Sequence, residues 1–201
     1  MNLQVEPLAL RAKFQIELGS PREAFHFHLR PIEPHTPMNE TPLQTENLRL
    51  VALTLEEVRA RIDGMDSDQK AALSPEWLAR VQQVATGAEV WTLGFTIVHR
   101  ATEAVVGQCA FKGPPTEDKT VEIAYMIAPE HQGKGYATEA ARALATFALS
   151  SGQVRVVRAH TLREQNASTR VLAKCGFRHI GEVVDPEDGV VWRWEKHNDA
   201  V

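Results

Sequence analysis

The chain has 201 residues, 43% of them hydrophobic and 24% charged, with a formal net charge of -4. These values suit a globular domain with a buried core, and they argue against nucleic-acid binding, which needs a basic patch. No stretch approaches the roughly 20 apolar residues of a membrane helix. Arg11, Lys13 and Glu17 interrupt the apolar residues that a secretory leader would need. The two cysteines are therefore expected to be free thiols, and the location to be cytoplasmic.

Residues 1–44 are expected to form an N-terminal extension or linker. Six of the eleven prolines lie in the first 47 residues, and the proline-rich stretch 31–42 is typical of an extended linker. The alternation in residues 25–29 (FHFHL) favours a short strand or arm within it. Met38 offers a second start, and an ordinary extension explains the segment equally well. Residues 45–201 are expected to form one domain.

The first elements of this domain carry recognisable start signals. Residues 48–53 (LRLVAL) predict a strand. Thr54 then caps a helix, and Glu57 three residues later completes a capping box. A second helix is predicted from Ser74 and Pro75, because proline is favoured at the first helical position. Both helices carry an apolar stripe that is expected to face inward.

The rest of the chain predicts strands that are interrupted by two further helices. Strands are expected at 91–100, 105–112, 120–128, 154–161, 177–184 and 190–196. Helices are expected at 137–150 and 167–174, the second ending at a left-handed Gly176. This order predicts an α+β fold. It consists of a single mixed, largely antiparallel central sheet of about seven strands flanked by about four helices.

Residues 129–137 (PEHQGKGYA) connect a predicted strand to a predicted helix. Gly133 and Gly135 have no Cβ, so a ligand can approach the main chain closely. The first amide groups of a helix lack acceptors within the helix, and with the helix dipole they attract an anion such as phosphate. Lys134 adds a positive charge. The spacing of the glycines does not match the P-loop. It does not match the dinucleotide-binding motif G-x-G-x-x-G either, because Thr138 stands where that motif has its last glycine. Taken alone, the glycines also suit a turn that binds nothing.

The same turn resembles a known family. Residues 132–137 (QGKGYA) match the Q/R-x-x-G-x-G/A motif of the GNAT acetyltransferases, whose main-chain amides hold the pyrophosphate of acetyl-CoA. The surrounding segment resembles the branch that contains the ribosomal-protein N-terminal acetyltransferases. Residues 166–177 (NASTRVLAKCGF) resemble the family's second helix and the following strand. The resemblance covers roughly residues 45–196. It implies the GNAT fold, acetyl-CoA as co-substrate and an amine as acceptor.

The resemblance also implies which residues hold acetyl-CoA. The turn supplies Gln132, Gly133, Lys134, Gly135, Tyr136 and Ala137. A main-chain N–H at the end of the preceding strand polarises the thioester carbonyl, as in an oxyanion hole, and it belongs to Met126, Ile127 or Ala128. Asn166 is expected to hydrogen-bond the pantetheine or the thiol.

Glu122 is the predicted general base. It lies on the strand that leads into the turn, ten residues before Gln132, and it matches a position where several family members carry a catalytic glutamate. An alkyl ammonium has a pKa near 10 and an α-amino group one near 8, so attack requires the loss of a proton. A carboxylate can accept this proton directly or through water. A structural, ion-paired Glu122 is the alternative.

The acid for the leaving thiolate is harder to predict. Leu172 stands where many relatives carry a tyrosine. Ser168 and a bound water are the candidates in its place, although a hydroxyl near a helix start is often a cap. Cys175 is expected to be a small buried residue rather than a nucleophile, because direct transfer needs no acyl-enzyme.

The acceptor cleft is expected between the helices within residues 54–87 and the turn at 185–189. These segments carry acidic residues that either attract a cationic acceptor or form a solvated face: Asp63, Asp66, Asp68, Asp185, Glu187 and Asp188. No Cys/His spacing resembles a zinc site, and His99 and His160 are expected to be surface or satisfied residues. The sequence leaves open whether the chain forms a homodimer. The rival function is a non-catalytic acyl-CoA-binding module, which Leu172 favours.

Overall fold

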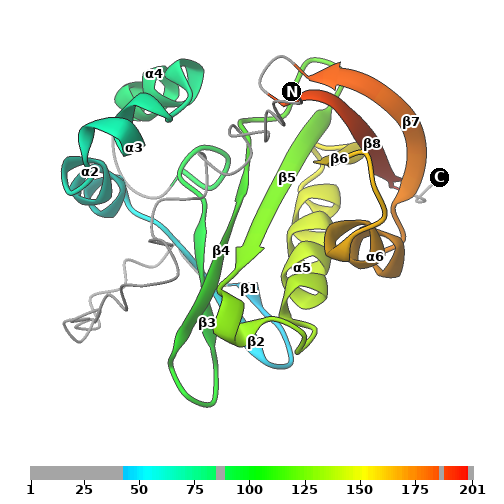
Figure 1. Cartoon of the computed structure of the whole chain (residues 1–201), viewed down its shortest axis with the longest axis horizontal. Helices are drawn as coiled ribbons and strands as arrows, with labels where there is room; N and C mark the ends of the chain where they lie inside the picture. Colours follow the sequence, from blue (N-terminus) through cyan, green and yellow to red (C-terminus); the bar gives the residue numbers. More distant parts are fainter. Residues whose placement is uncertain (1–42, 85–88, 186–187, 199–201) are drawn as a thin grey trace, which may run out of the picture.

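The computed structural model describes residues 43–84, 89–185 and 188–198, so the predictions for residues 1–42 lie outside the described residues. Eight strands in this part form one sheet in the order β1-β2-β3-β4-β5-β6-β8-β7 (Figure 1). Only the β5–β6 pair is parallel. The strands are β1 (Leu43–Gln44), β2 (Leu48–Ala52), β3 (Phe95–His99), β4 (Val105–Phe111), β5 (Thr120–Ile127), β6 (Val156–Thr161), β7 (Arg178–Asp185) and β8 (Gly189–His197). The predicted mixed, largely antiparallel α+β sheet is confirmed.

The helices begin where the sequence provides caps. The Thr54 hydroxyl accepts the N–H of Glu57, and the Glu57 side chain reciprocates, which confirms the predicted capping box. Asn166 forms a capping box with Thr169, whereas the Ser74 hydroxyl accepts the Trp77 N–H without a reciprocal bond. Figure 1 shows α2–α4 grouped beyond β3 and β4, whereas α5 and α6 lie beside β5 and β6. The helices are α2 (Leu55–Asp63), α3 (Ser67–Ala71), α4 (Pro75–Gln83), α5 (Tyr136–Ser150) and α6 (Ala167–Lys174), with a 3₁₀ turn η1 (Pro129–His131).

The two faces of the sheet differ in polarity. Apolar residues of β2–β6 and β8 pack with α5 and α6 into the main core, which includes Phe111, Ile123, Leu144 and Trp194. Trp192 packs against the same core, as its spacing from Trp194 predicts. Alternate residues face the other side, where Lys112, Arg158 and His160 lie near Glu122.

β5 and β6 diverge along their length. Their pairing covers only Thr120–Glu122 against Val156–Arg158, although β5 continues to Ile127. On its other edge β5 stays paired with β4, and the Ala128 N–H donates to the Val106 carbonyl at 2.9 Å. In an antiparallel ladder, hydrogen-bonded residues alternate. The amides of Tyr125 and Ile127 therefore point toward the divergence, whereas those of Ala124 and Met126 point toward β4.

Three local features differ from the sequence-based expectation. β3 begins at Phe95 rather than at residue 91. The preceding residues form a turn that ends at Gly94, whose φ of 82° is left-handed and whose carbonyl accepts the Leu53 N–H at 2.9 Å. Residues 91–94 were expected to belong to the strand, but the left-handed conformation of Gly94 ends a turn at this point. The short helix α3 was not predicted. Leu43 and Gln44, assigned to the extension, pair with β2 as β1.

Candidate active site

The glycine turn between β5 and α5 has the geometry of an anion site. Gly133 and Gly135 have φ values of 75° and 86°, a left-handed conformation that favours glycine. A Cβ added at either residue would meet no protein atom within 4 Å, so the space above the turn is open to a ligand. Gly135 is the N-cap of the 15-residue helix α5, and within the described chain no side chain caps this helix. Its first N–H groups can therefore bind an anion.

The neighbours of these glycines hold the turn in place. The Gln132 Nε2 donates to the Ile127 carbonyl at 2.9 Å and so ties the turn to the end of β5. The Tyr136 ring packs against the core and lies 5.4 Å from the His99 ring. Lys134 is exposed beside the glycines, and Ala137 is half-buried in the first turn of α5. The predicted cofactor residues of the turn thus lie together at one end of the β5–β6 divergence.

Three consecutive residues were predicted to supply the thioester N–H. The Ala128 N–H is already bonded to Val106, and the Met126 N–H points toward β4 by the alternation of the ladder. Of the three, Ile127 directs its N–H into the divergence. Tyr125 does so as well, and sequence reasoning missed it. A donor at these positions would face an acyl group lying between β5 and β6.

Glu122 on β5 lies in a cluster of ionisable side chains that come from β6, β7, β8 and the residue that follows β4. Its Oε1 is 2.6 Å from the Lys112 Nζ, and its Oε2 is 3.4 Å from the His160 Nδ1. The same His160 nitrogen is 3.4 Å from the Asp185 Oδ2. The Arg193 Nε lies 3.5 Å from the His160 Nε2. The His160 side chain is 6% exposed and that of Glu122 19%, so this cluster is largely buried.

The cluster determines the charge of Glu122. Burial by itself raises the pKa of Glu122, but the neighbouring His160 ring and the Lys112 ammonium outweigh it and bring the pKa to about 2. Glu122 is therefore ionised at neutral pH. This suits the binding of an ammonium group, and it makes the resting carboxylate a weak base. This arrangement corresponds to the structural, ion-paired Glu122 that was the alternative to a general base.

The start of α6 lies opposite β5. The Asn166 Oδ1 accepts the Thr169 N–H at 3.1 Å, so Asn166, and not Ser168, caps the helix. Ser168 is half-buried, and its carbonyl accepts the Tyr125 hydroxyl at 3.5 Å. Burial raises the pKa of the Tyr125 phenol well above its ordinary range, so this hydroxyl remains a donor. In the sequence, Tyr125 follows the pattern of a buried strand residue. Its phenol, which reaches from β5 to α6, was therefore not predicted.

Leu172 and Cys175 have structural environments. Leu172 is fully buried in the main core and carries no polar atom to offer a thiolate. Cys175 is 3% exposed, and its Sγ donates to the Thr138 carbonyl at 3.3 Å. Burial raises the pKa of this thiol above its ordinary value, which disfavours the thiolate that a nucleophile requires. Cys175 is therefore the small buried residue that the sequence predicts.

Residues 41–178 match the sequence profile of the acetyltransferase (GNAT) domain family. The chain belongs to the GNAT family. It is 30% identical over 93 residues to the uncharacterized N-acetyltransferase p20 of Bacillus licheniformis, covering 46% of this chain and 52% of the relative. It is 35% identical over 81 residues to the uncharacterized N-acetyltransferase YjdG of Bacillus subtilis, covering 40% and 48%. This GNAT chain thus spans about half the length of these curated relatives.

Solved GNAT structures share the fold of this chain. The ribosomal-protein-S5-alanine acetyltransferase from Vibrio fischeri is 18% identical, with a TM-score of 0.58 over 80% of this chain and 98% of that one. RimL, a ribosomal L7/L12 alpha-N-protein acetyltransferase in complex with coenzyme A, is 17% identical, with a TM-score of 0.57 over 78% and 97%. At this identity the likeness concerns the fold.

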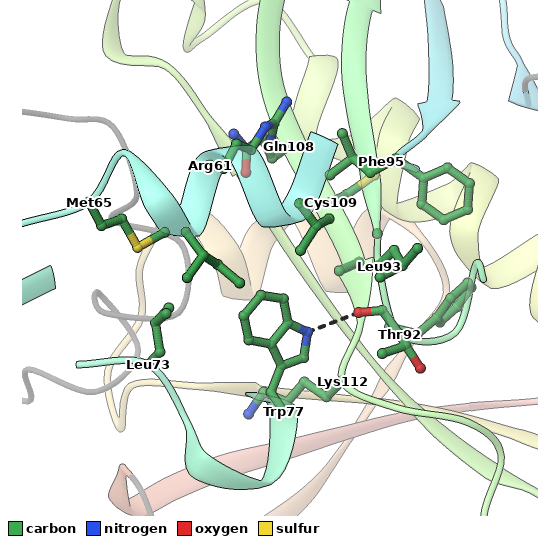
Figure 2. A pocket seen from close by; sticks show the side chains of 16 residues that line it. Arg61, Met65, Leu73, Trp77, Thr92, Leu93, Phe95, Gln108, Cys109 and Lys112 are labelled. Atoms are coloured by element: carbon green, nitrogen blue, oxygen red, sulfur yellow. Dashed lines mark hydrogen bonds between the residues drawn. The ribbon is translucent and has the colours of Figure 1, made fainter. Parts of the chain in front are cut away.

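The GNAT domain has a pocket on the polar side of the sheet, between α2, α4 and strands β3 and β4 (Figure 2). Lys112 lies at its edge, so the pocket adjoins the charge cluster of Glu122. Of the acidic residues predicted to attract a cation, Asp185 and Asp188 lie near enough to Lys112 to raise its pKa, and the others lie elsewhere or are not described. Asp66 caps α3, and Asp185 contacts His160. Asp63 and Asp68 are exposed, and Glu187 is outside the described residues.

Two kinds of feature are absent from the described part of the GNAT chain. No helix there combines the length and apolar character that crossing a bilayer requires. No group of three or more His, Cys, Asp or Glu residues there is arranged to hold a metal ion.

Proposed function

We propose that this chain transfers an acetyl group from acetyl-CoA to a primary amine. The observation that supports this most directly is the open glycine turn at the start of α5, placed at one end of the β5–β6 divergence. Glu122 lies on β5 where the divergence begins, on the polar face of the sheet. An anion site, an open strand edge and an ionised carboxylate are therefore arranged along one strand.

The donor side follows from the chemistry of acetyl-CoA. The amides of Gly133 and Gly135 and the α5 terminus hold the pyrophosphate, with Lys134 supplying a positive charge. The pantetheine lies along the open edge of β5, near Asn166 at the start of α6. The Ile127 N–H donates to the thioester carbonyl and stabilises the negative charge that develops there. Met126 and Ala128 position this strand end through their pairing with β4.

The acceptor side involves Glu122. The incoming ammonium replaces Lys112 at the carboxylate and transfers its proton to Glu122 directly or through a water that Glu122 holds. The neutral nitrogen then attacks the carbonyl carbon, the C–N bond forms, the C–S bond breaks to release the CoA thiolate, and the proton that the nitrogen loses as the amide forms passes to this thiolate to give CoA thiol. The thiolate needs a hydrogen-bond donor. Ser168 remains a candidate, and the Tyr125 phenol beside it is a second one.

A Tyr125→Phe variant tests the phenol. We expect kcat to fall about tenfold or more, since donors at developing charge contribute roughly 10²–10³-fold in well-formed sites. The KM for acetyl-CoA should change little, and the Tm should stay within a few degrees, because the Ser168 contact is long. Ser168→Ala is the parallel variant. If Tyr125→Phe retains full kcat while Ser168→Ala loses it, the acid is Ser168.

A non-catalytic acyl-CoA-binding module is the second candidate function. Leu172 in place of a tyrosine and the low pKa of Glu122 favour it, since neither supplies obvious acid–base chemistry. Release of CoA thiol from acetyl-CoA separates the two functions. The panel contains alkylamines, a diamine and peptides with free alanine or serine N-termini, because RimL and the S5-alanine enzyme act on proteins.

We expect thiol release matched by acetylated amine with at least one class of the panel. Mass spectrometry of the protein after acetyl-CoA alone should show no acetyl adduct, because the reaction is a direct transfer. Saturable acetyl-CoA binding without turnover across the whole panel would instead establish the binding module. The free, buried cysteines, Cys109 and Cys175, are consistent with the proposed cytoplasmic location.

A further inference from the structure

We propose that the pocket between α2, α4 and the sheet receives a compact aliphatic group carried by the acceptor amine. This inference rests on the acetyl transfer proposed above and names its substrate class. Figure 2 shows the Trp77 ring standing between Leu73 and Leu93, with its N–H directed at the Thr92 carbonyl. That hydrogen bond, at 2.9 Å, satisfies the only polar atom of the indole, so Trp77 presents an apolar surface to the pocket.

The wall of this pocket is mostly apolar. Helix α2 and the segment after it contribute Val58, Ile62 and Met65, and the opposite side is formed by Leu93 and by residues of β4. The pocket encloses about 70 Å³. An apolar cavity of roughly 150 Å³ accepts benzene. The available space therefore suits a smaller group, such as a branched chain of about three or four carbons.

The charges around the pocket favour an acceptor that has one ammonium group at Glu122 and no second ammonium group inside the pocket. Lys112 lines the pocket and is 2.6 Å from Glu122, so an amine bound at Glu122 has its attached group beside the pocket. The charged residues among those lining the pocket are Lys112 and Arg61, and both are positive. A second ammonium on the acceptor would enter an apolar space bordered by these cations. Polyamines are therefore expected to be poor acceptors.

The central experiment compares two primary amines of similar length with the full chain. 3-Methylbutylamine carries one ammonium and a branched aliphatic group, whereas 1,4-diaminobutane carries a second ammonium. We expect kcat/KM to be about tenfold or more higher for 3-methylbutylamine, since apolar pockets discriminate roughly 10–200-fold per methylene group. Leucine amide and serine amide form a second pair that differs only in the side chain.

An Ile62→Asp variant introduces a carboxylate into the pocket wall. Ile62 is half-buried and packs against a small cluster of buried apolar residues, so the Tm of the variant is measured first to establish that it folds. We expect it to reverse the preference, lowering kcat/KM for 3-methylbutylamine about tenfold and raising it for 1,4-diaminobutane. Ala60→Asp is the matched control, because Ala60 is exposed on the same helix and does not line the pocket. This control should keep the wild-type preference.

The outcomes separate the two proposals. Equal kcat/KM for both amines in the wild type, or an unchanged ratio in a folded Ile62→Asp, overturns the pocket assignment and leaves acetyl transfer intact. No turnover with either amine or with any other member of the amine and peptide panel, while CoA still binds, overturns acetyl transfer, whereas turnover with peptides but with neither amine overturns the pocket assignment. Where no amine or peptide is turned over and 3-methylbutylamine raises the Tm of the wild type but not that of Ile62→Asp, the pocket still binds aliphatic groups. If 3-methylbutylamine does not raise the Tm of the wild type, the pocket is not an aliphatic site.

Discussion

Gly135→Ala is expected to weaken acetyl-CoA binding by about 10–100-fold. The new Cβ would project into the open space above the turn, where a bound pyrophosphate must approach the main chain. Loss of one charge-assisted hydrogen bond to the amides costs roughly 1.5–3 kcal/mol. The left-handed φ of 86° adds a conformational cost of about 1–2 kcal/mol to the folded state. The Kd for CoA by calorimetry and the KM for acetyl-CoA measure the first effect.

Gly152→Ala provides the matched control for strain. Gly152 follows α5 and also has a left-handed φ, 74°, with no protein atom within 4 Å of an added Cβ. It should lose a similar amount of stability, measured by denaturant unfolding, and should retain the wild-type Kd for CoA. If both variants bind CoA like the wild type, the turn is not the pyrophosphate site. If both lose binding equally, strain rather than ligand contact explains the loss.

Glu122→Gln is expected to reduce kcat/KM for the amine by tenfold or more and also to destabilise the fold. The shift in the pKa of Glu122 from 4.5 to about 2 corresponds to about 3 kcal/mol favouring the ionised form. Glutamine removes this contribution and leaves the largely buried Lys112 ammonium without its carboxylate. Steady-state kinetics with saturating acetyl-CoA and urea unfolding at pH 7 measure the two effects.

The pH dependence of Glu122→Gln distinguishes this explanation from a packing defect. The folded-state pKa of Glu122 is depressed, so its contribution is present above pH 4.5 and disappears as the pH falls through about 2. The difference in unfolding free energy between wild type and variant should therefore shrink across this range. A difference that stays constant down to pH 2 would indicate lost packing. Adding Lys112→Met to Glu122→Gln should recover stability but not activity.

The sequence alone predicted the features that depend on neighbouring residues. The Thr54–Glu57 capping box and the Ser74 cap each involve residues three positions apart. Gly176 is left-handed as predicted, with a φ of 81°. The glycine turn is equally local, since its conformation and the α5 terminus arise within a few residues. These signals sufficed for the order of the elements other than β1 and α3 and for the family, and they located the candidate donor turn.

Only the tertiary structure decided which side chains meet at Glu122. Lys112 follows β4, and His160 and Asp185 lie on β6 and β7, so their proximity depends on the register and order of the sheet. The divergence of β5 from β6, which exposes the Ile127 amide and leaves the Tyr125 phenol reaching α6, has no counterpart in local periodicity. The pocket beside Lys112 likewise forms only when α2 and α4 pack against β3 and β4. The candidate donor turn could thus be located from the sequence because it is contiguous, whereas the proposed acceptor side is assembled from distant residues.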